Sequence, residues 1–271
     1  MIKTIDKILN QLFPLNRSLT GNANILTLKY IKNHIPIKIK KIDSGKKVFD
    51  WKVPMEWELE YGCIIDLNTN KKIISSKESN LHIIGYSSPI NKIVNLNELK
   101  KHLHYHKIKD AIPYRTTYYS KEWGFCITKN QFNKLTKYKG PFHVLIKSKF
   151  KKSNMPYGEL VVKGKSKKEF LISTYICHPA LANDNLSGVV ATIFLAKKIL
   201  LKKNLKYTYR IIFIPETIGA IAYCYLNLKK LKNIFSGLVV ANVGGPGSFS
   251  FKESHDSNHF LNSLIKKVFN N

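Results

Sequence analysis

The second half of the chain alternates short apolar runs with amphipathic ones, and this alternation constrains the fold more than any other feature. Apolar runs of this length are typical of buried strands, and stretches with helical spacing separate them. The expected order is strand 159–163, strand 170–176, helix 189–201, strand 210–214, helix 218–231, strand 237–243 and helix 260–269. This alternation predicts an α/β fold, with a mostly parallel sheet covered by helices on both faces.

The first half changes in texture at about residue 48. The elements expected before it are helix 5–12, helix 24–33 and strand 37–42. From there to residue 151, the chain has short alternating runs, many turn residues and all three of its tryptophans. We therefore expect a β-rich inserted domain at 48–151, and an α/β domain built from 1–47 and 152–271.

Three histidines of this insertion, His102, His104 and His106, stand two residues apart. On a strand they would share one face, where a metal ion could bridge them. Leu99 and Leu103 fit the spacing of a helix at least as well. Solvated histidines are the interpretation that we favour.

Residues with chemical potential follow the buried strands directly. His178 follows the first, Glu216 the second, and the glycine-rich residues 244–247 the third. Asp184 lies just before the helix that separates the first two strands. Because ligands of open α/β sheets bind outside the carboxyl ends of the strands, we expect these groups on one rim.

These residue types suit zinc chemistry. Neutral imidazole and ionised carboxylate are good ligands for Zn²⁺, which keeps one position open in catalytic sites. Bound zinc lowers the pKa of its water from 15.7 to about 7 and polarises a carbonyl, while a nearby carboxylate takes the proton of the water. Glu216 suits the last role, because a carboxylate at the end of an apolar strand is costly unless it is paired, metal-bound or catalytic.

Each residue also has a purely structural interpretation. His178 could be a hydrogen-bonded core histidine, Asp184 an N-cap and Glu216 an acid that complements a helix dipole. Their conjunction at successive strand ends favours a functional site. The sequence has no G-x-S-x-G nucleophile elbow, no G-x-G-x-x-G and no P-loop, which disfavours serine hydrolases and nucleotide binding.

The formal charge of +28 invites a nucleic-acid role, which the distribution of cations disfavours. There are 45 Lys and Arg residues against 17 acids, and Arg occurs only at positions 17, 115 and 210. Base recognition favours the bidentate fork of arginine. The excess of lysine, asparagine and isoleucine indicates compositional drift on a solvated surface, and we expect no specific nucleic-acid partner.

The four cysteines are far apart and form no C-x-x-C pair. They predict reduced thiols in a cytoplasmic protein, and the first residues lack the pattern of a secretory signal. No apolar run reaches the ~18 residues of a membrane-spanning helix.

Segments around the candidate site resemble a known family. They are STYICHP (173–179), NDNLSG (183–188) and FIPETIG (213–219), with further agreement over 12–21, 48–54 and 112–126. They are similar to the bacterial aminopeptidase-like proteins associated with polysaccharide biosynthesis. That family is similar in turn to the di-zinc aminopeptidases of the zinc-exopeptidase superfamily.

The resemblance implies a zinc-exopeptidase-like three-layer α/β sandwich with a β-rich insertion. It implies that His178 and Asp184 bind zinc and that Glu216 is the general base. The expected substrate is a small peptide or amide, hydrolysed by metal-activated water in a polysaccharide-related pathway.

Three positions depart from the di-zinc pattern. Ala180 stands where an Asp orients the histidine, Thr217 where a second Glu binds metal, and Gly245 where a further Asp is expected. We therefore expect one zinc ion, bound weakly.

Length is a fourth departure. The relatives are longer, with more strands, a late metal-binding His and a winged-helix domain, and neither His255 nor His259 matches that late His. The sandwich is therefore expected to be incomplete, either as a natural truncation or as a gene fragment. The alternative to a hydrolase is a non-catalytic remnant that acts as a binding module.

Overall fold

The structure, a computed structural model, describes residues 2–269. The α-helices are α1 (Ile2–Leu12), α2 (Asn22–Lys32), α3 (Leu96–Lys101), α4 (Lys129–Leu135), α5 (Gly188–Leu200), α6 (Ile218–Leu231) and α7 (Phe260–Phe269). The strands are β1 (Lys38–Asp43), β2 (Lys47–Val48), β3 (Trp51–Lys52), β4 (Glu56–Asp66), β5 (Lys71–Ser75), β6 (Ile90–Val94), β7 (Leu103–His104), β8 (Phe125–Cys126), β9 (Phe142–Lys151), β10 (Asn154–Val162), β11 (Glu169–Tyr175), β12 (Thr208–Ile214) and β13 (Ile234–Val239). Across the described residues, no helix combines the length and the apolar character that a transmembrane span requires.

A five-stranded sheet with the order β1-β10-β12-β11-β13 carries the α/β elements. β11 runs parallel to β12 and β13, whereas β10 runs antiparallel to β1 and β12. The expectation of a mostly parallel sheet is therefore wrong, and the sheet is mixed. The reason is the insertion: the chain leaves the sheet through β1 and returns at the same end through β10, so these neighbours run in opposite directions.

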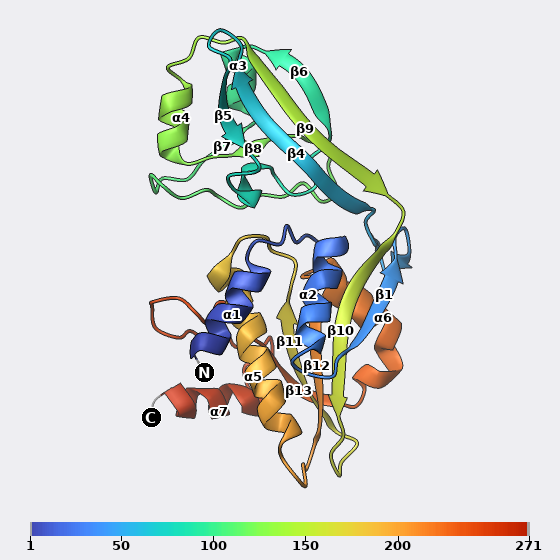
Figure 1. The fold of residues 1–271 in the computed structure, drawn as a ribbon. Coiled ribbons are helices and arrows are strands. Elements are labelled where there is room, and N and C mark those ends of the chain that lie inside the picture. Colours follow the sequence, from blue (N-terminus) through green and yellow to red (C-terminus); the bar gives the residue numbers. More distant parts are fainter. Residues whose placement is uncertain (1, 270–271) are drawn as a thin grey trace.

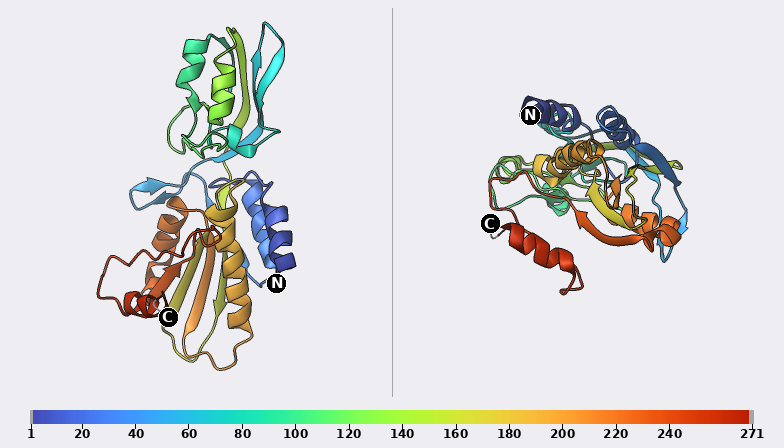
Figure 2. Two further views of the ribbon diagram at one scale, coloured as in Figure 1. Left: turned by 90° about the vertical axis from the view of Figure 1, so that its left-hand side faces the viewer. Right: turned by 90° about the horizontal axis from the view of Figure 1, so that it is seen from below.

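Side chains of β12 alternate between two apolar cores. Ile211 and Phe213 pack with residues of α1, α2 and α5, whereas Ile212 and Ile214 pack with residues of α6. Helices thus cover both faces of the five-stranded sheet, as the alternation of the sequence predicts (Figures 1 and 2).

The segment between β1 and β10 contains a second, antiparallel sheet with the order β5-β4-β9-β6. This sheet lies with α3 and α4 in the upper part of Figure 1. One apolar core joins the two parts, since it extends from Trp57 and Tyr86 of the insertion to Ile214 and Ala222 near the strand ends of the larger sheet. The division into two domains stays a prediction, and the shared core packs the insertion against the rim of the larger sheet.

A buried ion cluster ties four strands of the larger sheet together. Arg210 donates to Glu169 over 2.5 and 2.9 Å and to Glu159 over 2.6 Å. Tyr223 of α6 donates to the same Glu159 over 2.7 Å, and Lys40 of β1 pairs with it as well. Because each buried charge has an opposite partner, the cluster fixes the register of β10, β11 and β12.

The three histidines of the insertion do not join a metal-binding group within residues 2–269. His102 stacks on Trp123 with ring centroids 3.5 Å apart, and its Nδ1 lies 3.1 Å from the Trp123 carbonyl oxygen. His106 is exposed, and its Nδ1 accepts a hydrogen bond from the backbone of Ile108. His106 is thus solvated as expected, whereas His102 is held by an aromatic neighbour and His104 is half-buried in β7.

Candidate functional site

The three residues expected at the strand ends meet in the structure. His178 Nε2 lies 2.7 Å from Oε1 of Glu216, and His178 Nδ1 lies 3.2 Å from Oδ1 of Asp184. The histidine side chain is 6% exposed, against 34% for Glu216 and 41% for Asp184. A buried imidazole therefore stands between two carboxylates that solvent can reach.

Strand register explains why residues far apart in sequence meet here. β11 and β12 are parallel neighbours, and their last residues, Tyr175 and Ile214, lie opposite each other. The pairing extends one step further, because Ile176 donates its N–H to the Ile214 carbonyl over 3.2 Å. His178 comes two residues after Ile176, and Glu216 comes two residues after Ile214. The two side chains therefore leave the sheet side by side.

Asp184 is held by the turn between β11 and α5. This turn covers Ala182–Ser187, its backbone angles are non-helical at Asp184 and Asn185, and the peptide bond between these two residues is cis. Tyr175 donates its hydroxyl to Asp184 Oδ1 over 2.5 Å. The buried Asn185 amide donates to the Thr174 hydroxyl over 2.9 Å and to the Tyr175 carbonyl over 3.0 Å. These bonds tie the turn to the end of β11 and keep Asp184 beside His178.

The chain that leaves β13 is fastened to the same turn by hydrogen bonds from three backbone N–H groups. The pairs are Asn242 with Asn185 Oδ1 (3.2 Å), Val243 with Ser187 Oγ (3.0 Å) and Gly244 with Asn183 Oδ1 (2.9 Å). The packing is close as well, because a Cβ atom at Gly188 would lie 2.5 Å from the Val240 carbonyl oxygen. The third strand end therefore supports the Asp184 turn through its backbone and adds no carboxylate.

The pKa values of His178 and Asp184 are determined mainly by the pairing of the imidazole with its carboxylate neighbours. Burial acts to lower the pKa of His178, but the close contacts with Asp184, Cys177 and Glu216 outweigh burial and raise it to about 12. The close contact with His178, opposed by burial, lowers the pKa of the Asp184 carboxyl. These side chains alone therefore form an imidazolium–carboxylate pair.

Sequence reasoning missed Cys177, which it treated as one of four reduced thiols. Its Sγ accepts a hydrogen bond from the Glu216 N–H over 3.3 Å, and its complete burial raises the pKa of the thiol. Ligand atoms of Cys177, His178 and Glu216 lie within 4.8 Å of one another, which makes them the one such triplet in residues 2–269. The sequence feature that could have identified Cys177 is its position directly before His178, at the end of a buried strand.

Two aromatic rings flank His178. Their centroids lie 4.7 Å (Tyr114) and 5.1 Å (Tyr175) from that of the imidazole. Tyr114 comes from the insertion, and its hydroxyl shares a 2.9 Å hydrogen bond with that of Tyr118. Burial raises the pKa of both insertion tyrosines, so both stay neutral. The insertion therefore supplies one wall of the candidate site.

Arg17 adds a buried charge near this wall. Burial lowers its pKa to about 10, against smaller opposing effects of Cys177 and Tyr114. The residue is 2% exposed, its Nη1 donates to the Leu12 carbonyl, and its Nη2 has no hydrogen-bond partner among the described residues. Sequence reasoning assigned no role to Arg17 or Tyr114, although both lie in segments that carry the family resemblance. The unpaired guanidinium favours negative charge in its surroundings.

The geometry fits one zinc ion between His178 and Asp184. The Nδ1 atom of His178 is buried, and its 3.2 Å contact with Asp184 Oδ1 is not aligned as a hydrogen bond. Two ligand atoms of tetrahedral zinc, each at ~2.0–2.1 Å from the metal, stand roughly 3.3 Å apart. On the other side of the ring, Nε2 can donate to Glu216, which is the arrangement that orients metal-binding histidines.

Two positions that depart from the di-zinc pattern have an unusual backbone. Ala180 has a φ of 42° and Thr217 a φ of 51°, in the left-handed region that β-branched residues avoid. Neither Ala180 nor Thr217 has a carboxylate that could bind a metal ion, and Gly245 has no side chain. The rim therefore lacks the acid that orients the histidine and the two further acids of the di-zinc pattern.

Two surface pockets lie away from this rim. One is bordered by β6 and β9, and the other, beside α1 and α2, is lined by residues such as Lys7, Tyr30 and His34. At the rim itself, the carboxylates of Asp184 and Glu216 are partly exposed to solvent.

The chain is similar over nearly its whole length to proteins of Clostridium acetobutylicum. It is 42% identical over 265 residues to a protein described as "Putative polysaccharide biosynthesis protein with aminopeptidase-like domain", a match that covers 97% of this chain and 60% of that protein. A crystal structure described as a "putative peptidase" of the same organism matches with a TM-score of 0.92 and 41% identity, over 98% of this chain and 62% of that chain. The chain therefore spans about three fifths of these relatives.

More distant structures share the fold. The zinc aminopeptidase BSAP of Bacillus subtilis matches with a TM-score of 0.61 and 14% identity, over 89% of this chain and 68% of that chain. A peptidase M28 precursor of Shewanella amazonensis matches with a TM-score of 0.58 and 10% identity, over 87% and 69%. The mixed α/β architecture is thus that of zinc aminopeptidases. The family model described as "Domain of unknown function (DUF4910)" matches residues 6–271, and the chain belongs to this family.

Proposed function

We propose that this protein is a zinc-dependent hydrolase of the aminopeptidase-like type that cleaves an amide or peptide bond. The observation that carries the proposal is the position of His178 between Asp184 and Glu216, with a buried Nδ1 that makes no hydrogen bond. His178 and Asp184 would hold one zinc ion, and Glu216 would be the general base. The similarity to aminopeptidase-like relatives supports the same assignment.

In this mechanism, each side chain has a separate task. When bound, zinc supplies a nucleophilic water at neutral pH and polarises the scissile carbonyl. Oε1 of Glu216 is occupied by His178, so Oε2, to which no described residue donates, takes the proton from the attacking water and returns it to the leaving amine. Tyr114 shields one face of the His178 ring from water.

We further propose a small peptide or amide as the substrate, within a pathway that modifies polysaccharides in the cytoplasm. The partial exposure of Asp184 and Glu216 supports a substrate that reaches these two side chains from solvent. The description of the Clostridium acetobutylicum relative supports the pathway. The cysteines, all free thiols, support the location.

Zinc content and hydrolysis of the purified chain test the proposal together. Titration with a competing zinc dye is expected to show one ion per folded chain, and both His178→Ala and Asp184→Asn are expected to lose it. A panel of aminoacyl-p-nitroanilides is expected to reveal hydrolysis that a chelator abolishes and zinc restores. A folded protein that binds no zinc and hydrolyses no amide of the panel would refute the assignment.

A second candidate function, a non-catalytic binding module, is favoured by one specific observation. Ala180, Thr217 and Gly245 replace three acids of the di-zinc pattern at a rim whose backbone is otherwise well ordered by hydrogen bonds. Zinc binding without any hydrolysis above that of the His178→Ala variant would support this module. Zinc-dependent turnover would exclude it.

A further inference from the structure

Strand β9 has an open edge where it leaves the four-stranded sheet. It pairs with β4 from Phe142 to Lys151, but with β6 only as far as Ile146, which lies opposite Ile90. Beyond this pair, none of the strands in residues 2–269 continues along that side of β9. The residue before β6 is Pro89, which has no backbone N–H to donate to a ladder. The last five residues of β9 therefore have no partner strand on this side among the described residues, and the segment before β6 is joined to them by a side chain, since the Ser148 hydroxyl donates to the Ser87 carbonyl over 2.8 Å.

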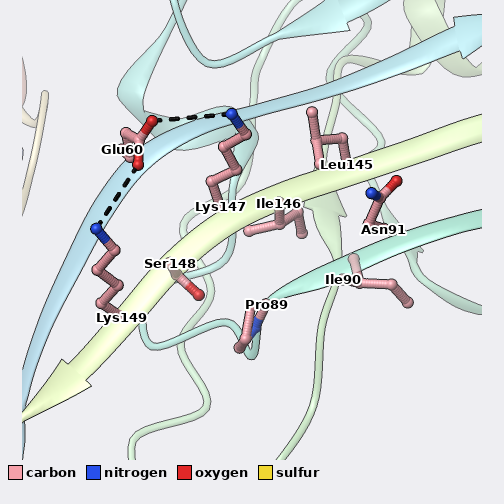
Figure 3. Close-up of a pocket in the computed structure, with 9 residues that line it drawn as sticks. All are labelled: Glu60, Pro89, Ile90, Asn91, Leu145, Ile146, Lys147, Ser148 and Lys149. Carbon is pink, nitrogen blue, oxygen red and sulfur yellow. Dashed lines mark ion pairs between the residues drawn. The ribbon is translucent and has the colours of Figure 1, made fainter.

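A groove of about 420 Å³ follows this edge (Figure 3). Its lining consists of the consecutive β9 residues 145–149 together with Glu60, Pro89, Ile90 and Asn91. Successive side chains of a strand point to opposite faces, so a run of consecutive lining residues means that the groove follows the strand edge. An extended peptide is the occupant whose shape and backbone hydrogen-bonding groups match such an edge.

The groove carries more positive than negative charge. Lys147 and Lys149 lie 3.9 and 4.0 Å from the two oxygens of the same Glu60 carboxylate, as Figure 3 shows. The lysine side chains are 55% and 76% exposed, so these long contacts engage them only weakly. Two cations that share one anion favour a partner with carboxylates of its own.

On its other side, β9 pairs with β4 along its whole length, and the charges of β4 show which sequence pattern suits this strand. There, β4 presents Glu56, Glu58 and Glu60 at alternate positions, and Lys151 lies 3.3 Å from Glu56 and 3.1 Å from Glu58. Opposite charges across neighbouring strands stabilise their pairing. An acidic strand with carboxylates two residues apart would repeat this relationship on the open side.

Two other occupants fit less well. Sugar rings bind by stacking on aromatic side chains, and none of the residues that line the groove is aromatic. A second copy of this chain carries 45 basic residues against 17 acids, so its approach to a basic groove is repulsive.

We propose that this groove binds an acidic, extended segment of a partner protein, which adds to β9 as a further strand. Lys147 and Lys149 contact its carboxylates, and the unpaired edge of β9 contacts its backbone. The groove is independent of the rim that holds His178, so its role does not depend on the hydrolase assignment.

Fluorescence anisotropy with a labelled decapeptide of alternating Glu and Val tests the proposal on the whole chain. The wild type is expected to bind it, and the double variant Lys147→Glu/Lys149→Glu is expected to bind at least about tenfold more weakly. The matched control Lys137→Glu/Lys139→Glu reverses two exposed lysines with the same spacing outside the groove, and is expected to bind as the wild type does. Circular dichroism checks that both variants are folded.

A second peptide separates strand pairing from charge attraction. Methylation of every backbone nitrogen removes the N–H donors and keeps the carboxylates, so binding is expected to fall at least about tenfold. The proposal is overturned if the wild type does not bind the first peptide, if the methylated peptide binds equally, or if the control variant loses as much affinity. Binding of polygalacturonate instead of the peptide, with dependence on Lys147 and Lys149, would assign the groove to an acidic glycan.

Discussion

His178 and Glu216 share a 2.7 Å hydrogen bond between Nε2 and Oε1 at the ends of two parallel strands. Through this bond, Glu216 orients the imidazole, and through its other oxygen it can accept a proton. The two tasks can be separated by substitution, because an amide keeps an acceptor oxygen and loses the basicity of the carboxylate.

Glu216→Gln is expected to lower the rate of zinc-dependent amide hydrolysis by about 10²–10⁴-fold, which is the usual contribution of a general base. Zinc stoichiometry should stay as in the wild type, because His178 and Asp184 remain. Initial rates and zinc titration on one preparation measure both quantities. Glu78→Gln, at an exposed acid of the insertion, serves as the control and should change neither. Loss of zinc from Glu216→Gln would make Glu216 a ligand.

Cys177→Ala is expected to leave zinc stoichiometry unchanged, because the proposed ligands are His178 and Asp184. The substitution should lower the free energy of unfolding by about 1 kcal/mol, since the thiol is completely buried. Zinc titration and urea denaturation measure the two effects, with Cys126→Ala as a buried thiol of the insertion for comparison. A folded Cys177→Ala protein without zinc would move the metal to the triplet of Cys177, His178 and Glu216.

Gly188→Ala is expected to cost about 1–3 kcal/mol of stability, because the new Cβ would overlap the Asn185 side chain and lie 2.5 Å from the Val240 carbonyl oxygen. The same displacement should weaken zinc binding through the Asp184 turn. Gly247→Ala is the matched control, since nothing lies within 4 Å of its Cβ position. Urea denaturation of both variants tests the contact, and equal midpoints would show that the turn tolerates a methyl group.

Glu159 is expected to make stability depend on acid pH. Burial acts to raise its pKa, but hydrogen bonds from Lys40, Tyr223 and Arg210 outweigh burial and hold it below the ordinary value of 4.5. A carboxyl with a depressed pKa contributes its full stabilisation above pH 4.5, and the contribution is lost as pH falls through the lower, folded-state pKa.

Urea denaturation between pH 3 and 7 of the wild type and of Glu159→Gln measures this contribution. The wild type should lose stability more steeply below about pH 4.5 than the variant does. At neutral pH, Arg210→Met is expected to cost about 3–5 kcal/mol, because it leaves the buried carboxylate of Glu169 without a cation and that of Glu159 with Lys40 alone. Parallel pH profiles for wild type and Glu159→Gln would assign the acid sensitivity to other carboxyls.

The rim could be predicted from the sequence because it depends on local signals. The apolar runs that became β11 and β12 end within a residue of their expected positions, and a parallel arrangement then brings His178 and Glu216 together. The last strand was expected at 237–243 and is found at Ile234–Val239, because a turn of only two residues, Lys232 and Asn233, separates it from the end of α6. The direction of β10 depends on where the chain leaves the sheet for the insertion and where it returns. Hydrophobic periodicity does not predict these positions.

Contacts that the insertion makes with the rim could not be predicted. Tyr114 lies 64 residues before His178 and reaches it only because the two parts of the chain share an apolar core. Cys177 has no spacing to any other cysteine or histidine that marks a metal ligand, so only the fold shows that its sulfur faces Glu216. The open edge of β9 likewise depends on how far β6 extends along it.

Two of the three arginines of this chain, Arg17 and Arg210, lie in its interior. Arg210 uses three nitrogens on two glutamates, a geometry that a lysine ammonium cannot reproduce. Lysine therefore carries most of the positive charge of this chain, whereas Arg210 performs a task in the interior that needs the guanidinium fork. Arg17, the other interior arginine, brings a second permanent positive charge close to the candidate site.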